Sequence, residues 1–88
     1  MRILLVEDDP LLGDALRAGL GQAGYDVDWV RDGQGALAAM RDGEHAAVVL
    51  DLGLPKLPGL DVLARARGAG IRLPVLVLTA RDALDDRV

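Results

Sequence analysis

Carboxylate side chains follow two short apolar segments that lie far apart in this sequence. Glu7 and Asp8 come directly after the apolar run at residues 3–6, and Asp51 comes directly after the run at residues 46–50. Carboxylates that converge oppose one another's ionisation, and a divalent cation that prefers oxygen ligands relieves this repulsion. If the two runs form neighbouring strands, these residues predict a Mg²⁺ site at the strand ends.

The chemistry predicted for such a site is phosphoryl transfer. Mg²⁺ is commonly bound through one or two carboxylates, keeps several waters and accepts phosphate oxygens as further ligands. A carboxylate held beside the ion, here Asp51, is a competent nucleophile toward phosphorus, and the product would be an aspartyl phosphate. Thr79 ends another apolar run and could donate a hydrogen bond to a phosphoryl oxygen, together with the backbone N–H of Ala80.

A parallel sheet is needed to bring these acids together, and the order of segments predicts one. Three short apolar runs and one segment of alternating apolar and acidic residues are typical of strands, and the segments between them have helical spacing. This alternation predicts helices on both faces of a parallel sheet, with right-handed crossovers and the alternating strand at an edge. The expected strands are residues 3–6, 25–29, 46–50 and 75–78, and the expected helices begin near Pro10, Ala36, Leu60 and Arg81.

Local residue types predict how the helices begin and which of their faces are apolar. Asp9 precedes Pro10 and is expected to cap the first helix rather than to bind metal. Recurring apolar residues mark one face of each helix. The predicted faces contain Leu12, Leu16 and Leu20 in the first helix, Ala36, Leu37 and Met40 in the second, and Leu60, Leu63 and Ala64 in the third.

The composition excludes several classes of protein. A chain of 88 residues with 51% apolar residues forms one small domain, and the absence of cysteine excludes disulfides and cysteine metal sites. The single histidine, His45, excludes multi-histidine sites and is expected at the surface, whereas Tyr25 and Trp29 are expected to pack at a sheet edge. A net charge of -4 argues against a large nucleic-acid face. No apolar run approaches the roughly 20 residues of a membrane helix, so a cytoplasmic location is expected.

Three segments of the sequence resemble the receiver domain of bacterial two-component response regulators, and shorter motifs resemble its OmpR/PhoB type. The resemblance extends over all 88 residues in the same order and spacing. It implies a flavodoxin-like (CheY-like) three-layer α/β/α sandwich whose parallel sheet has the strand order 2-1-3-4. The matching segments are residues 3–9, 49–55 and 74–81, and the shorter motifs are residues 24–25, 32–37 and 85–88.

The resemblance implies a role for each candidate site residue. Asp51 matches the phosphoacceptor, Asp8 the direct metal ligand, and Glu7 a neighbour that acts on the metal through water. Asp51 and the backbone carbonyl of Gly53 complete the protein's metal ligands, and Thr79 matches the switch hydroxyl. The phosphoryl donor would be a phosphohistidine on a sensor histidine kinase. A C-terminal winged-helix DNA-binding domain would regulate transcription in the full-length protein, and the domain would be a signalling module rather than an enzyme.

The sequence differs from the family at its C-terminus. The family continues with a fifth strand and helix that carry a lysine and an aromatic switch residue, whereas this sequence ends at Val88. Lys56 lies in the loop after Asp51 and does not match that lysine. Residues 1–88 are therefore expected to be an incomplete receiver domain. Strand 75–78 would then be an apolar sheet edge, through which the chain is expected to self-associate or exchange elements with a partner.

Two other functions are compatible with acids at strand ends. A Mg²⁺-dependent phosphatase of the haloacid dehalogenase type also uses an aspartate after a strand, but it needs a second acid two residues later, where this chain has Gly53. A non-catalytic interaction module with vestigial acids is the other alternative. Phosphorylation by acetyl phosphate with Mg²⁺ distinguishes the three, because a receiver domain gains one labile phosphoryl group.

Overall fold

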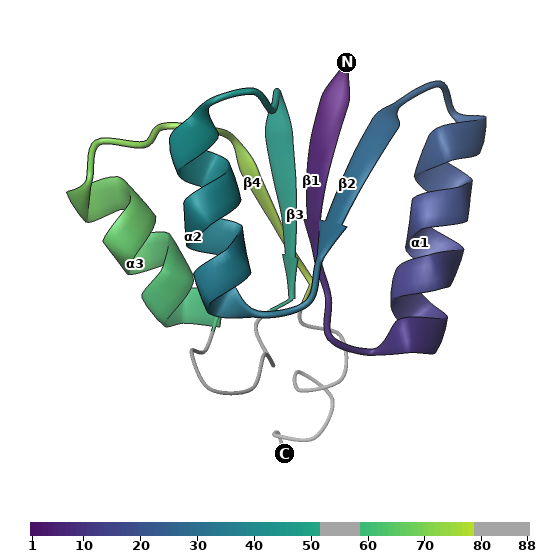
Figure 1. Ribbon diagram of the computed structural model, residues 1–88, viewed down its shortest axis with the longest axis horizontal. Coiled ribbons are helices and arrows are strands. Elements are labelled where there is room, and N and C mark those ends of the chain that lie inside the picture. Colours follow the sequence, from purple (N-terminus) through teal and green to yellow (C-terminus); the bar gives the residue numbers. More distant parts are fainter. Residues whose placement is uncertain (52–58, 79–88) are drawn as a thin grey trace.

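A four-stranded parallel sheet forms the centre of the computed structural model, which describes residues 1–51 and 59–78 (Figure 1). The strand order is β2-β1-β3-β4, as predicted. The expected fourth helix lies outside the described residues. In chain order the elements are β1 (Arg2–Val6), α1 (Pro10–Gln22), β2 (Asp26–Val30), α2 (Gly33–Asp42), β3 (Ala47–Asp51), α3 (Gly59–Gly68) and β4 (Val75–Leu78).

Helices cover the sheet from both sides, which confirms the three-layer α/β/α architecture. Helices α2 and α3 lie on one face of the sheet and α1 lies on the other (Figure 1). Because strand side chains alternate between faces, β1 contributes to two cores. Leu4 and Val6 pack with α2 and α3, whereas Ile3 and Leu5 pack with the α1 side. All four side chains are buried, as expected for a central strand in a doubly covered sheet.

Helix caps determine where the chain turns back toward the sheet. Asp9 caps α1, and its carboxylate accepts hydrogen bonds from the backbone N–H groups of Leu11 and Leu12. Asp32 caps α2 in the same way, and Gly43 ends α2 with a φ of 74°, a conformation that favours glycine. The predicted role of Asp9 as a cap is therefore confirmed.

The register of the sheet aligns the strand ends that carry the acids. Val6 at the end of β1 lies opposite Leu50 of β3, so that Glu7 and Asp51 are the next residues on the two strands. On the other side of β1, Val6 lies opposite Val30 of β2. Parallel pairing of β1 with β3 therefore places the carboxylates from both segments at one edge of the sheet.

The predicted apolar face of α3 is only partly correct. Val62 and Ala66 are the side chains that α3 buries in the core, whereas Leu60 is 62% exposed and Ala64 is also exposed. Among the predicted residues of α1, Leu12 is 42% exposed. The sequence prediction favoured the larger leucines, but the contact of α3 with α2 and the sheet selects a face with smaller side chains. No helix in the described ranges has the length and apolar character needed to cross a membrane.

The prediction that His45 lies at the surface is wrong. His45 is 8% exposed, and its Nε2 atom lies 2.8 Å from Oδ2 of Asp28. Arg2 Nε lies 3.5 Å from the same carboxylate oxygen. Arg2 begins β1, Asp28 is the middle residue of the neighbouring strand β2, and His45 lies two residues before β3. The sheet brings Asp28 beside the imidazole, and no local sequence pattern indicates this contact.

Candidate metal centre

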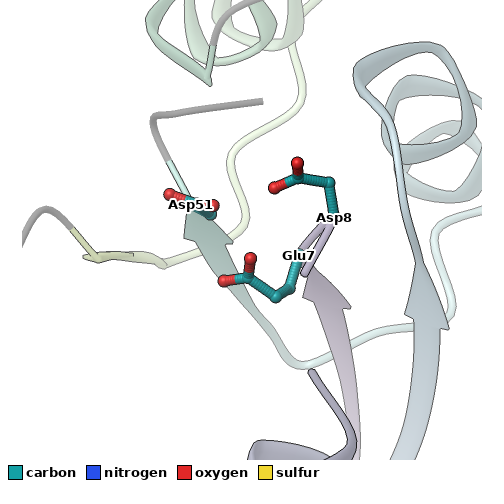
Figure 2. Close-up of side chains that lie close together, drawn as sticks. All are labelled: Glu7, Asp8 and Asp51. Carbon is teal, nitrogen blue, oxygen red and sulfur yellow. The ribbon is translucent and has the colours of Figure 1, made fainter. Parts of the chain in front are cut away.

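Three carboxylates meet at the edge formed by the carboxyl ends of β1 and β3 (Figure 2). Glu7 and Asp8 follow β1, and Asp51 is the last residue of β3. One carboxylate oxygen from each residue can be chosen so that the three lie within 4.8 Å of one another. Glu7 is fully buried, Asp51 is 5% exposed and Asp8 is half-buried, so the cluster is open to solvent on the Asp8 side.

One oxygen of the Glu7 side chain accepts a hydrogen bond from the backbone, and the other oxygen is buried. Its Oε2 atom accepts a hydrogen bond of 3.0 Å from the backbone N–H of Asp9. Its Oε1 atom is buried and has no hydrogen-bond partner among the described residues. A buried carboxylate oxygen without a donor is costly. A cation bound between the acids, or a water on that cation, would satisfy it.

Burial and neighbouring acids make ionisation of Glu7 unfavourable. Burial is the largest cause, and it raises the pKa of Glu7 from an ordinary value of 4.5 to about 7. The hydrogen bond from the Asp9 backbone lowers this pKa, whereas a hydrogen bond with Asp51 and the charges of Asp51 and Asp8 raise it. In the absence of a cation, Glu7 therefore keeps its proton to a higher pH than an exposed glutamate does.

These residues fit a hard divalent cation. The three side chains offer carboxylate oxygens close enough to share one ion, and oxygen ligands are those that Mg²⁺ prefers. Glu7 and Asp8 form no ion pair with any residue in the part of the chain that the structure describes. Their negative charge therefore has no counter-ion from these residues, and a metal ion would supply one.

The predicted convergence of Glu7, Asp8 and Asp51 is confirmed by the geometry. Gly53, Thr79 and Ala80 lie outside the described residues, so their predicted roles as carbonyl ligand, switch hydroxyl and phosphate-binding N–H stay predictions. The acids that converge come from segments far apart in the sequence. Their meeting depends on the β1–β3 pairing, which places both strand ends side by side.

Sequence reasoning missed a contact between Trp29 and this cluster. The prediction placed Trp29 at a sheet edge, and it does lie on the edge strand β2. Its indole Nε1 also donates a hydrogen bond of 2.9 Å to the backbone carbonyl of Glu7. A lone tryptophan in an alternating strand carries no sequence signal for such a bond, because the acceptor is a backbone atom 22 residues away in the sequence.

Gly13 of α1 is required by the position of the Trp29 ring. A Cβ atom at Gly13 would clash with atoms Cζ2 and Cε2 of the indole. We expect Gly13→Ala to lower the free energy of unfolding by about 1–3 kcal/mol, because the ring must shift in a packed interface. Urea unfolding followed by circular dichroism measures this change.

Gly19→Ala is the matched control in the same helix. A Cβ atom at Gly19 meets nothing within 4 Å among the described residues. Alanine is the better helix former, so this variant should gain about 0.5–1 kcal/mol. Equal effects of the two substitutions would contradict the close contact between Gly13 and Trp29.

Comparison with known proteins identifies the family of this chain. Residues 3–88 match the response regulator receiver domain family, and the chain belongs to this family. Its members are signalling domains rather than enzymes in the usual sense. The resemblance stated from the sequence is thus confirmed over nearly the whole chain.

Curated relatives are longer proteins that are named as transcriptional regulatory proteins or response regulators. The chain is 54% identical over 88 residues to the transcriptional regulatory protein QseB of Haemophilus influenzae. It is also 54% identical to the response regulator PmrA of Pseudomonas aeruginosa. Each match covers 100% of this chain and 40% of the relative. The chain therefore spans about 40% of the length of these OmpR/PhoB-type proteins.

Solved structures share the fold. A receiver domain of a Pseudomonas aeruginosa sensor histidine kinase, determined with a magnesium ion in its active-site cleft, has a TM-score of 0.88 and 36% identity over 97% of this chain and 70% of that one. A structure of the Thermotoga maritima histidine kinase ThkA with the response regulator TrrA gives a TM-score of 0.83 and 31% identity, covering 99% of this chain and 73% of that one. The flavodoxin-like receiver fold is therefore established.

Proposed function

We propose that this domain accepts a phosphoryl group on Asp51, with Mg²⁺ bound by Asp8 and Asp51 and, through water, by Glu7. The observation that carries the proposal is the meeting of three carboxylate oxygens within 4.8 Å at the carboxyl edge of the sheet. Binding of ligands beyond the carboxyl ends of parallel strands is general for open α/β sheets. The backbone carbonyl of Gly53 is the fourth group of the protein that we propose to bind Mg²⁺.

Each acid has a separate part in the proposed transfer. The bound ion would supply positive charge that attracts a phosphoryl donor and stabilises the charge that develops during transfer. Asp51 is held nearly buried at the end of a rigid strand, so its carboxylate can approach phosphorus from a fixed position. Asp8 is half-buried and faces the solvent side, where hydrated Mg²⁺ and a donor can enter.

The transfer forms one bond and breaks one bond. A carboxylate oxygen of Asp51 forms an oxygen–phosphorus bond as the phosphorus–nitrogen bond of a phosphohistidine breaks, and the imidazole leaves with the electron pair and takes up a proton. Thr79 and the N–H of Ala80 are the proposed donors to the transferred phosphoryl group. The product is an acyl phosphate, which water can later hydrolyse.

A sensor histidine kinase is the proposed donor of the phosphoryl group. The structural relative TrrA was determined in complex with the histidine kinase ThkA, which supports this class of partner. The longer relatives QseB and PmrA are named as a transcriptional regulatory protein and a response regulator. We propose a corresponding role in transcription, with DNA bound by a domain other than residues 1–88 and the cytoplasm as the compartment.

Incubation with acetyl phosphate tests the proposed function directly. Intact mass spectrometry should show one added phosphoryl group with Mg²⁺ present and none when EDTA removes the metal. The adduct should be released by hydroxylamine, which cleaves acyl phosphates. Absence of an adduct, although the folded chain binds Mg²⁺, would contradict the proposal. Sustained hydrolysis of acetyl phosphate with many turnovers would instead favour the phosphatase alternative.

We also propose that β4 mediates self-association. Leu76 of β4 lies opposite Val49 of β3, and it therefore points to the α1 face of the sheet. Helix α1 packs on β1 and β2, and Leu76 is 63% exposed. Strand β4 is the last strand of the sheet in the described part of the chain, so its outer backbone groups can pair with another chain.

Light scattering after size exclusion measures the self-association. The mass should rise with concentration for the original chain, and Leu76→Lys should shift it toward the monomer, because a charge on the exposed face opposes pairing. Leu60→Lys is the control, since Leu60 is 62% exposed but lies on α3. A compact monomer that melts cooperatively at all concentrations would overturn this proposal.

A further inference from the structure

The end of β2 holds the backbone of the two acids that follow β1. The indole Nε1 of Trp29 donates a hydrogen bond of 2.9 Å to the carbonyl of Glu7. The backbone N–H of Glu7 donates to the carbonyl of Val30 at 3.1 Å. A guanidinium nitrogen of Arg31 lies 3.4 Å from the carbonyl of Asp8 and donates a longer, weaker bond. The last two residues of β2 and Arg31, which follows them, therefore contact the backbone at Glu7 and Asp8.

The bond from Trp29 acts on a particular peptide group. The carbonyl of Glu7 belongs to the peptide bond that joins Glu7 to Asp8, and this group is planar and rigid. The orientation of this plane sets ψ of Glu7 and φ of Asp8, the two backbone torsions on either side of it. The indole N–H therefore constrains the relative direction of two carboxylates that must both face Asp51.

The indole ring is itself fixed in place. It lies directly against Gly13 of α1, where no larger side chain fits. It also packs with the cluster that contains Leu5, Leu16 and Leu20. The guanidinium carbon of Arg31 lies 5.4 Å from the ring centroid, which is within the range of a cation–π contact. Because the indole is held from several directions, its N–H can fix the position of the Glu7 carbonyl that accepts from it.

We propose that Trp29 is a positioning residue for the metal-binding acids, acting through its hydrogen bond to the peptide between Glu7 and Asp8. This inference rests on the proposed function, because it assigns Trp29 a role toward the Mg²⁺ site. Contacts outside the ligand set commonly orient the ligands, and their loss typically weakens metal binding by about tenfold or more. Packing of the ring alone would not have this consequence.

A ring isostere separates the hydrogen bond from the packing. Trp29 is the only tryptophan of the chain, so biosynthetic replacement by benzothienylalanine changes this position alone and substitutes sulfur for the indole N–H. Isothermal titration with Mg²⁺ should show a dissociation constant raised about tenfold. The melting temperature without Mg²⁺ should change by no more than roughly 8 °C, the shift expected for one hydrogen bond in a small domain.

Tyr25→Phe is the control, because it removes a polar group from an aromatic residue just before β2. Its affinity for Mg²⁺ should equal that of the original chain. An unchanged affinity in the benzothienylalanine chain would overturn the positioning role while leaving the proposed function intact. An original chain that binds no Mg²⁺ would overturn the proposed function and this inference together.

A second measurement needs no variant. The single indole N–H gives one resonance in a ¹H–¹⁵N spectrum, and this resonance should shift during Mg²⁺ titration along the same saturation curve as the calorimetric signal. The shift is expected because metal binding at the two carboxylates repolarises the carbonyl to which the indole donates. An indole resonance that stays unmoved at saturating Mg²⁺ would contradict the inference, even if the isostere chain failed to fold.

Discussion

Asp51→Asn is expected to gain no phosphoryl group from acetyl phosphate under conditions that phosphorylate the original chain. The amide cannot act as the oxygen nucleophile, and it also removes one negative charge from the metal site. Intact mass spectrometry over a time course measures the difference. An undiminished adduct in Asp51→Asn would place the phosphoryl group on another residue and would sink the assignment of Asp51.

Loss of folding does not account for the expected result. Asp51 raises the pKa of Glu7 through its charge, so neutralising Asp51 relieves repulsion in the metal-free protein. Asp51→Asn should therefore melt at or above the temperature of the original chain in EDTA. Asp42→Asn, at the exposed end of α2, is the matched control and should be phosphorylated normally.

Glu7→Gln is expected to stabilise the metal-free protein at pH 8. Folding raises the pKa of Glu7 from 4.5 to about 7, so the folded state binds this proton more tightly than the unfolded state. The stability contributed by the proton is fully present below about pH 4.5 and is lost as the pH rises through 7. Glutamine has no proton to lose in this range, so the variant should avoid the loss.

The expected gain is on the order of 2 kcal/mol at pH 8 in EDTA, and it should shrink toward pH 5. One pKa unit corresponds to about 1.4 kcal/mol, and water on the open side of the cluster reduces the full value. Urea unfolding at both pH values measures it. Glu44→Gln, at a residue that pairs with Arg2 on the surface, should show no such pH dependence. A gain that is the same at pH 5 and pH 8 would contradict the raised pKa.

Saturating Mg²⁺ should reverse the order of stability of the original chain and Glu7→Gln. Mg²⁺ binds the folded protein and stabilises it by mass action, more strongly when all three carboxylates are ionised. We therefore expect saturating Mg²⁺ to stabilise the original chain more than Glu7→Gln. Stability is lowest for the metal-free, ionised site, which is the state in which a receiver domain is ready to bind its ion.

The sequence by itself determined the order of elements and the identity of the acids. Continuous apolar runs predicted β1, β3 and β4, since central parallel strands are buried on both faces and need apolar residues throughout. Asp9 before Pro10 predicted the start of α1, because capping depends on neighbouring residues alone. The acids were predicted to form a site because each follows an apolar run. Ligands of an open parallel sheet bind beyond the carboxyl ends of such strands.

Tertiary structure decided the contacts that depend on partners distant in sequence. It selected Val62 and Ala66 rather than Leu60 as the buried face of α3, because packing against α2 and the sheet favours shape over hydrophobicity alone. It also buried His45 beside Asp28. Neither outcome has a local pattern, since each arises when two segments meet.

The same division holds at the site. The residue types at Glu7, Asp8 and Asp51 predicted an oxygen-rich metal site, but only the pairing of β1 with β3 brought the three carboxylates together. The contact from Trp29 to the backbone of Glu7 was not predictable, because every residue has a backbone carbonyl and the sequence does not indicate which one an indole will reach. The type of a residue determines the chemistry of its side chain, whereas the helices and strands packed around the residue determine where that side chain points.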